Sequence, residues 1–120
     1  MEPNSVMYMV GLHCRPDQEE KLNKWYNERH IPDLLKFKGV KGVTRYEIYK
    51  KVITPDMVYP DVKYPKYLAV YEFENQESFE VFEASPERDE AIKEARETWA
   101  EDGYERVWRV VYKALKTWKR

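Results

Sequence analysis

The sequence predicts an α+β fold of the ferredoxin-like type, in which an antiparallel four-stranded sheet carries two helices on one face. With 120 residues the chain has the length of one domain, so we expect residues 1–120 to form a single unit. Four segments show the alternation of strands, and two stretches of helical periodicity follow the first and the third of them. The order β-α-β-β-α-β is that of the ferredoxin-like motif.

The first strand is expected at residues 5–13, where both alternating sets of side chains are apolar. Such a strand is covered on both faces. Because two helices can cover only one face of the sheet, we expect a partner chain to cover the other. Asp17 then precedes Glu20 at the spacing of a capping box and predicts the start of a helix, which Gly39 would stop. One face of this helix carries Leu22, Trp25, Tyr26 and Arg29.

The end of this helix, residues 25–35, brings an imidazole, carboxylates, a guanidinium and two aromatic rings into one short stretch. Pro32 disfavours the α region at Ile31, so we expect the helix to break directly after His30. A helix C-terminus favours a charged imidazole, while an apolar cavity favours the neutral ring. The two effects oppose each other, and His30 is expected to titrate near neutrality beside a cavity. The alternative is a structural histidine that satisfies free helix carbonyls.

Two further strands follow, at residues 40–51 and 66–74, and the second is rich in strand-forming residues. The connection between them contains several prolines and tyrosines, and we expect it to pack on the protein. Asn75 predicts the start of the second helix, and Ser85 predicts its restart before a proline. Its apolar positions are Phe79, Phe82, Ile92, Ala95 and Trp99.

The last strand is expected at residues 104–118, which is long enough to reach beyond its own sheet. Simple alternation places Tyr104 on the same face as Trp108.

The composition excludes several classes of function. There are 21 basic and 22 acidic side chains, so no basic field exists to bind nucleic acid. No apolar stretch is long enough to span a membrane. Glu2 stands where a signal peptide would be positively charged, and the single Cys14 fits a reducing cytoplasm. Two histidines and one cysteine at no useful spacing predict no metal site. Aromatic residues make up 15% of the chain, which is typical of an aromatic cavity or a dimer interface.

Several positions carry a resemblance to a known superfamily: Trp25-Tyr26, His30, Pro32, Leu34-Leu35, Gly39, Arg45-Tyr46 and the segment YLAVYE at 67–72. Over nearly the whole chain the sequence resembles the dimeric α+β-barrel superfamily, and within it the EthD-like and related small uncharacterised proteins. The resemblance implies a homodimer whose sheets pair into a barrel, with a cavity between sheet and helices in each protomer. Residues 53–65 do not match the family pattern.

The superfamily includes cofactor-free oxygenases, polyketide cyclases, isomerases, some haem enzymes and many proteins without known activity. On that basis His30 would be the acid or base, and Tyr26 or Tyr46 would donate a hydrogen bond to a carbonyl or phenolate oxygen. Glu72 or Arg45 would orient the substrate. Trp25 and Trp108 would line the ligand site. The structural alternatives are a core aromatic for Tyr26, a solvated strand end for Glu72, and a pair with Asp33 for Arg29.

We therefore expect a cytoplasmic homodimer that binds a small apolar or aromatic ligand without nucleic acid, membrane, metal or cofactor. As an enzyme it would act by proton transfer from a substrate with an enolisable or phenolic centre. Oxygenation, cyclisation and isomerisation share this step, so the sequence leaves them open. The rival interpretation is a non-catalytic binding or accessory protein of the same fold.

Overall fold

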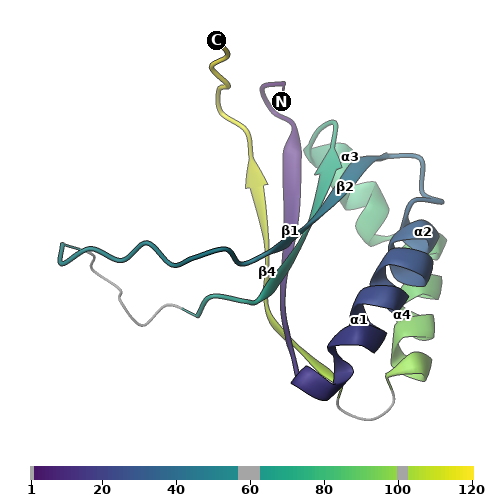
Figure 1. Cartoon of the computed structure of the whole chain (residues 1–120). Helices are drawn as coiled ribbons and strands as arrows, with labels where there is room; N and C mark the ends of the chain where they lie inside the picture. Colours follow the sequence, from purple (N-terminus) through teal and green to yellow (C-terminus); the bar gives the residue numbers. More distant parts are fainter. Residues whose placement is uncertain (1, 57–62, 100–102) are drawn as a thin grey trace.

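The computed structural model describes residues 2–56, 63–99 and 103–120 and confirms the α+β fold (Figure 1). Four antiparallel strands form one sheet in the order β2-β3-β1-β4. The second and last strands end earlier than the sequence pattern predicts. The strands are β1 (Val6–Cys14), β2 (Val40–Glu47), β3 (Tyr67–Phe73) and β4 (Tyr104–Lys113).

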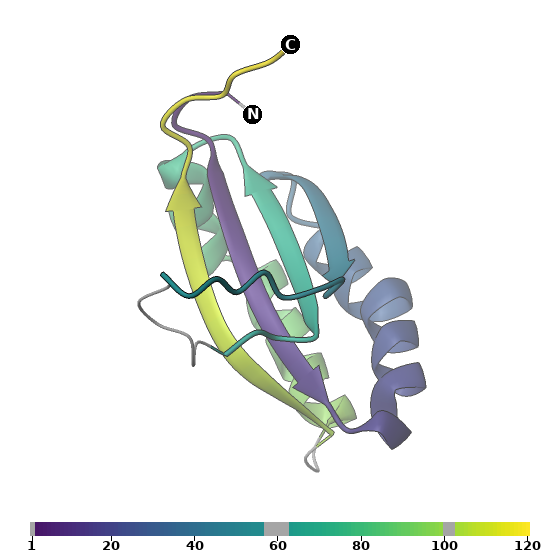
Figure 2. The same ribbon diagram turned by 60° about the vertical axis from the view of Figure 1, so that its left-hand side comes forward.

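Two helical regions cover one face of the sheet, as predicted (Figure 2). The first begins with a 3₁₀ turn and the second is divided into two helices at Ser85. In the described part of the chain, none of the helices has the length and apolar character needed to cross a membrane. The helices are α1 (Glu19–Trp25), α2 (Ile31–Leu34), α3 (Gln76–Glu83) and α4 (Pro86–Thr98).

The core lies between the sheet and the helices. Aromatic rings dominate the part of the core beside α3, where Phe82 of α3 packs against Phe73 of β3 with ring centroids 5.1 Å apart. Both side chains are almost fully buried, as the periodicity predicts for Phe82. The other buried members come from the strands and the helical regions: Val6, Val10, Leu12, Leu22, Trp25, Tyr26, Leu34, Val40, Tyr67, Ala69, Tyr71, Phe79, Ala91 and Ala95.

The helix starts are partly as predicted. Asn75 accepts a hydrogen bond from the Ser78 amide at 2.8 Å, and Ser85 accepts one from the Arg88 amide at 3.2 Å. The predicted Asp17 cap is wrong, because a 3₁₀ turn already begins at Pro16 and takes Asp17 into its interior. There the Asp17 carboxylate instead forms an ion pair with a neighbouring arginine.

The predicted break before Pro32 is also wrong. Ile31 keeps helical dihedral angles, φ −64° and ψ −46°, and the first helical region continues into α2. The residues before it, Tyr26–His30, form a π-helical segment, and the Ile31 amide bonds to the carbonyl of Tyr26, five residues back. A wider π turn gives room for the proline ring, which in an α-helix would clash with the carbonyl four residues earlier. His30 therefore lies inside a helical region and not at its C-terminus.

Strand β4 contains a bulge that the alternation did not predict. The register against β1 shifts by one residue and leaves Val107 without a partner. Tyr104 and Arg106 consequently face the helices, and so does Arg109 beyond the bulge, whereas Trp108 faces away. The predicted placement of Tyr104 beside Trp108 is thus wrong.

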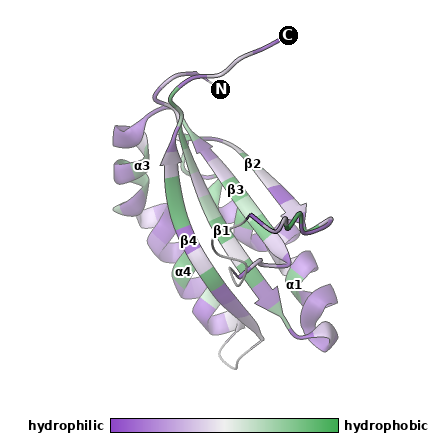
Figure 3. Ribbon diagram, turned by 90° about the vertical axis from the view of Figure 1, so that its left-hand side faces the viewer, coloured by the Kyte–Doolittle hydropathy of each residue, from purple (hydrophilic) through white to green (hydrophobic). Residues whose placement is uncertain are grey.

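Figure 3 views the face of the sheet opposite the helices, on which β1 and β4 present mainly apolar and aromatic side chains. The connection between β2 and β3 leaves the sheet on this side (Figures 1 and 2). Near the start of β3 it is anchored by Pro65, which is buried. Tyr59 of this connection lies outside the described residues. The apolar and aromatic side chains of this open face include Met7, Met9, Leu68, Val70, Trp108, Val110 and Tyr112.

Gly11 is where Pro65 approaches the sheet most closely. A Cβ atom at Gly11 would lie 2.6 Å from the Cγ atom of Pro65 and 3.3 Å from the Trp108 ring. Gly11→Ala is therefore expected to lower the free energy of unfolding by about 1–3 kcal/mol, as overpacking does. A Cβ atom at Gly42 would meet no other atom within 4 Å, so Gly42→Ala serves as the control in urea unfolding. Equal stabilities of the two alanine variants would contradict the close contact.

Candidate functional site

A small cavity of about 30 Å³ lies between the sheet and the helices, which is the size of one water molecule. Strands β1, β3 and β4 line one side, and the π-helical segment, α2, α3 and α4 line the other. Apolar side chains fill part of the wall, but most of the lining carries polar groups. The polar residues are Tyr8, Tyr26, His30, Tyr71, Arg88, Arg106 and Arg109.

His30 is held in this cavity by aromatic rings. The Trp25 ring stacks on the imidazole with centroids 4.6 Å apart, and the Tyr26 ring meets it edge-on at 4.9 Å. Trp25 is itself fixed, because its indole N–H donates to a carboxylate oxygen of Glu94 at 2.9 Å. The imidazole is only 7% exposed, and its Nδ1 atom is buried without a hydrogen-bond partner among the described residues. The cavity is therefore lined by a fixed histidine, one ring nitrogen of which has no hydrogen-bond partner among the described residues.

The histidine is neutral at neutral pH. Burial and, to a smaller extent, the positive charge of Arg106 together lower the pKa of His30 to about 4. The expected titration near neutrality is wrong, because the helix does not end at His30 and no C-terminal dipole opposes desolvation. A neutral imidazole can accept a proton without losing one first.

Two phenols stand beside the imidazole. The phenols of Tyr26 and Tyr71 are close enough to affect each other's pKa, and the Tyr8 ring centroid lies 5.5 Å from that of Tyr71. Burial raises the pKa of Tyr26 and Tyr71 well above the usual value, so both phenols stay protonated. Protonated phenols can donate hydrogen bonds to an oxygen atom that gains negative charge.

Arg45 lies next to Tyr26 but does not line the cavity. Its guanidinium stands 4.9 Å from the centroid of the Tyr26 ring and 5.5 Å from that of Tyr67. It also donates a hydrogen bond of 2.9 Å to the side chain of Asn27. Arg45 thus holds the Tyr26 ring from β2.

The remaining predicted site residues lie elsewhere. Tyr46, Glu72 and Trp108 are on the open face of the sheet, whereas His30 is on the helix side. Tyr46 is 52% exposed, and Glu72 is exposed and forms no ion pair in the described part of the chain. These three side chains do not meet His30 within one protomer.

Sequence reasoning missed five of the polar cavity residues. Tyr8 and Tyr71 are direct partners across β1 and β3, so the strand register would have revealed them. Arg106 and Arg109 are three residues apart, and only the bulge brings both to the helix side. The fifth, Arg88, carries no sequence signal that separates it from the other charged residues of α4.

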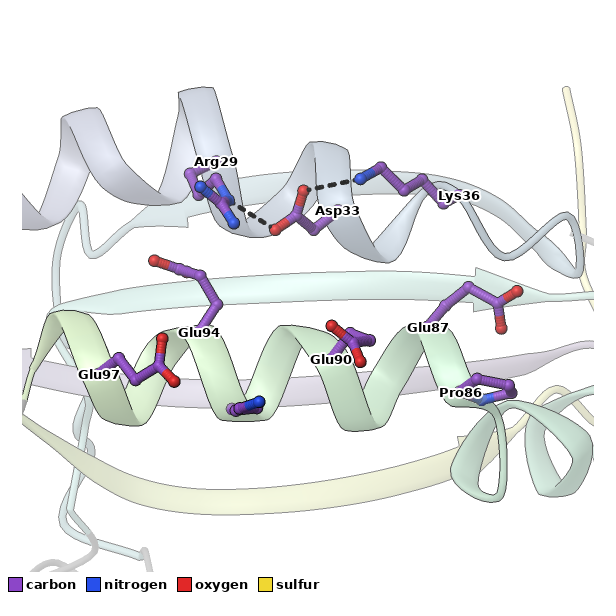
Figure 4. Close-up of a pocket in the computed structure, with 9 residues that line it drawn as sticks. Arg29, Asp33, Lys36, Pro86, Glu87, Glu90, Glu94 and Glu97 are labelled. Atoms are coloured by element: carbon purple, nitrogen blue, oxygen red, sulfur yellow. Dashed lines mark hydrogen bonds and ion pairs between the residues drawn. The ribbon is translucent and has the colours of Figure 1, made fainter.

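A second hollow of about 360 Å³ lies on the outer surface between α2 and α4. The predicted pair of Arg29 and Asp33 is confirmed here, with 2.8 Å between Nε and Oδ2, and Lys36 pairs with the same carboxylate at 3.3 Å (Figure 4). The α4 side presents a row of glutamates. Such a charged and solvated groove does not suit an apolar ligand. Its glutamates are Glu87, Glu90, Glu94 and Glu97.

Comparison with solved structures identifies the fold. HapK from Hahella chejuensis is 9% identical with a TM-score of 0.64, over 96% of this chain and 97% of that chain. An EthD family protein from Bacillus halodurans is 14% identical with a TM-score of 0.62, over 92% and 99%. SnoaB, a cofactor-independent oxygenase from Streptomyces nogalater, is 16% identical with a TM-score of 0.55, over 95% and 96%. At these identities the likeness shows the fold alone.

The resemblance to EthD-like proteins is confirmed by these structures. A comparison with curated protein sequences finds no match. Residues 5–105 match the family described as a domain of unknown function, DUF4286. The match extends from the start of the sheet to the first residues of β4 and includes the π-helical segment with His30. The chain therefore belongs to the DUF4286 family and has the ferredoxin-like α+β fold of EthD-like proteins.

Proposed function

We propose that this protein binds a small apolar or aromatic molecule whose reactive end enters the small cavity between sheet and helices, and that it transfers a proton from this end through His30, without a cofactor. The observation that carries the proposal is the buried imidazole, whose Nδ1 atom has no partner among the described residues and whose ring is fixed by Trp25 and Tyr26. A buried polar atom without a partner is costly unless it has a ligand to bind.

The chemistry follows from the protonation states. His30, neutral because of its burial, accepts a proton from an acidic C–H or O–H group of the substrate. The substrate oxygen becomes negative, and the protonated hydroxyls of Tyr26 and Tyr71 donate hydrogen bonds to it. Arg106 adds a positive charge, which also stabilises the anion. Oxygenase, cyclase and isomerase reactions all begin with such an anion.

His30→Gln is expected to abolish this proton transfer while leaving the fold intact, because glutamine can fill the site but is not a base. The probe is β-tetralone, an aromatic ketone with acidic methylene protons. Proton NMR in D₂O would follow their exchange for deuterium. We expect acceleration by the wild type and a loss of about 100-fold or more in the variant, as for a general base. Equal acceleration by the two proteins would remove His30 from the mechanism.

The second candidate function is non-catalytic binding by the same cavity. The low pKa of His30 favours it, because a weakly basic imidazole removes protons less effectively than one that titrates near neutrality. In this case His30 would only accept a hydrogen bond from the ligand. Binding of β-tetralone without faster exchange would support this function over catalysis.

We also propose that the active form is a homodimer paired through the open face of the sheet. Apolar side chains from β1, β3 and β4 lie on this face, and the helices of the same chain cover only the other. Large exposed apolar patches on one side of a sheet are typical of stable interfaces.

Val110→Lys is expected to convert the dimer to a monomer, since Val110 pairs with Met9 on the open face and a buried lysine would be unpaired. Light scattering at micromolar concentration would measure the mass. Val81→Lys is the matched control, because Val81 is 55% exposed on α3. A wild-type protein of monomer mass would rule out the dimer.

A further inference from the structure

A groove of about 440 Å³ between α4 and β4 opens directly beside the His30 cavity. The groove and the cavity share four lining residues, so only these side chains separate them. Ile92 is the apolar member of this partition. The other three are Arg88, Arg106 and Arg109.

The arginines of the groove are placed there by two independent features of the chain. On α4, Arg88, Ile92 and Arg96 are spaced by four residues and follow one face of the helix. On β4, the bulge at Val107 turns Arg106 and Arg109 to the same side. The groove thus receives four guanidinium groups, two from each element.

Among the described residues, no carboxylate lines this groove. The described lining of the groove contains four arginines and no acidic residue, although the whole chain carries a net charge of −1. The salt bridges of the described residues include none of the four. The Arg88 guanidinium donates a hydrogen bond to the backbone carbonyl of Glu83 at 3.5 Å, and the Arg106 guanidinium lies 5.6 Å from the Tyr104 ring centroid. Asp89 and Glu97 line a neighbouring hollow together with Arg88 and Arg96, but they do not line the groove itself.

Four cations that line one groove repel one another, and an anion that binds between them lowers this cost. The groove also has an apolar side, because Ile92, Trp99 and Tyr104 line it. Guanidinium groups bind carboxylates with two parallel hydrogen bonds and stack on aromatic rings. The groove therefore combines the partners of an aromatic body with those of an acidic group.

We propose that the ligand of this protein is an aromatic carboxylic acid, bound as the anion by the arginine groove with its reactive end directed at His30. This inference rests on the proposed function and specifies its substrate class. The second observation that points to a ligand is the buried, unpartnered Nδ1 atom of His30 in the adjoining cavity.

The test compares two probes of the same shape, cinnamate and its neutral amide, cinnamamide. Calorimetry and tryptophan fluorescence at fixed ionic strength would measure their affinities. We expect the wild type to bind cinnamate at least about tenfold more tightly than cinnamamide, as charge-assisted hydrogen bonds provide. Equal affinities would overturn the inference and leave the proposed function standing. If neither probe binds, both the inference and the proposed function are overturned.

Single variants locate the anion. Arg106→Gln and Arg109→Gln should each weaken cinnamate binding by about tenfold or more and leave cinnamamide unchanged. Arg15→Gln removes the same charge from an exposed residue outside the groove and should change neither affinity. Because the substituted side chains are exposed, the variants should unfold at the wild-type urea concentration. Equal losses in all three variants would show a general charge effect and overturn the arginine site.

A second readout uses His30 itself. Arg106 lowers the pKa of His30, so an anion bound at Arg106 should raise it again. An NMR titration of the His30 chemical shifts should give a higher pKa for this residue when cinnamate is present, and an unchanged pKa when cinnamamide is present. An unchanged titration with cinnamate bound would place the carboxylate away from the cavity and overturn the proposed orientation.

Discussion

Phe82→Ala is expected to lower the free energy of unfolding by about 3–5 kcal/mol, the usual cost of removing a buried phenylalanine ring. Phe82 is 1% exposed, and its ring contacts those of Phe73, Phe37 and Phe79 at centroid distances of 5.1, 5.5 and 6.2 Å. These rings join α3 to the sheet and to the end of the first helical region. Truncation of Phe82 therefore leaves a cavity that several elements would have to collapse to fill.

The neighbouring residue provides the control. Val81 is on the same helix and is 55% exposed, so Val81→Ala should change the free energy of unfolding by less than about 0.5 kcal/mol. Urea unfolding at pH 7 followed by circular dichroism would measure both variants. A loss below about 1 kcal/mol for Phe82→Ala would mean that α3 does not pack on the sheet in solution.

Acidification is expected to destabilise the protein through His30. Its pKa falls from 6.5 to about 4 on folding, so the unfolded chain binds more protons between these two values. The stability contributed by the neutral ring is fully present above pH 6.5 and is lost as the pH falls towards 4. A difference of this size corresponds to roughly 3 kcal/mol.

The measurement is urea unfolding at several pH values between 7 and 4. A His13→Gln background leaves His30 as the only histidine, because the chain has two. Adding His30→Gln should remove roughly 3 kcal/mol of the pH dependence, and the remainder belongs to carboxylates. Identical pH profiles with and without His30 would show that the imidazole is not desolvated in the folded protein.

The fold could be predicted from the sequence because its evidence is local and repeated. Strand alternation, helical spacing and the caps at Asn75 and Ser85 each depend on a few adjacent residues, and the structure confirms the four strands, the two helical regions and both caps. The prediction that Asp17 caps the first helix was wrong because Pro16 starts a 3₁₀ turn one residue earlier. Asp17 therefore lies inside that turn and not at the cap position, although its sequence pattern is that of a capping box.

The candidate site was only half predictable. Tyr26 and His30 belong to one short segment, and their proximity follows from helical spacing. Tyr46, Glu72 and Trp108 were grouped with them although strand parity separates the two faces of the sheet. The face of each side chain depends on register and on irregularities such as a bulge, which are set by pairing between distant segments. Neither the register nor a bulge can be predicted from a local sequence pattern.

The π-helical segment makes the orientation of His30 depend on chain length. A π segment is equivalent to one residue inserted into an α-helix, and each residue turns an α-helix by about 100°. Deletion of one exposed residue in this segment, such as Glu28, would restore the α-helical repeat. Every side chain that follows would then rotate by that angle relative to Trp25. In evolutionary terms, homologues that lack this single residue would keep the histidine in their sequence alignment and lose it from the cavity.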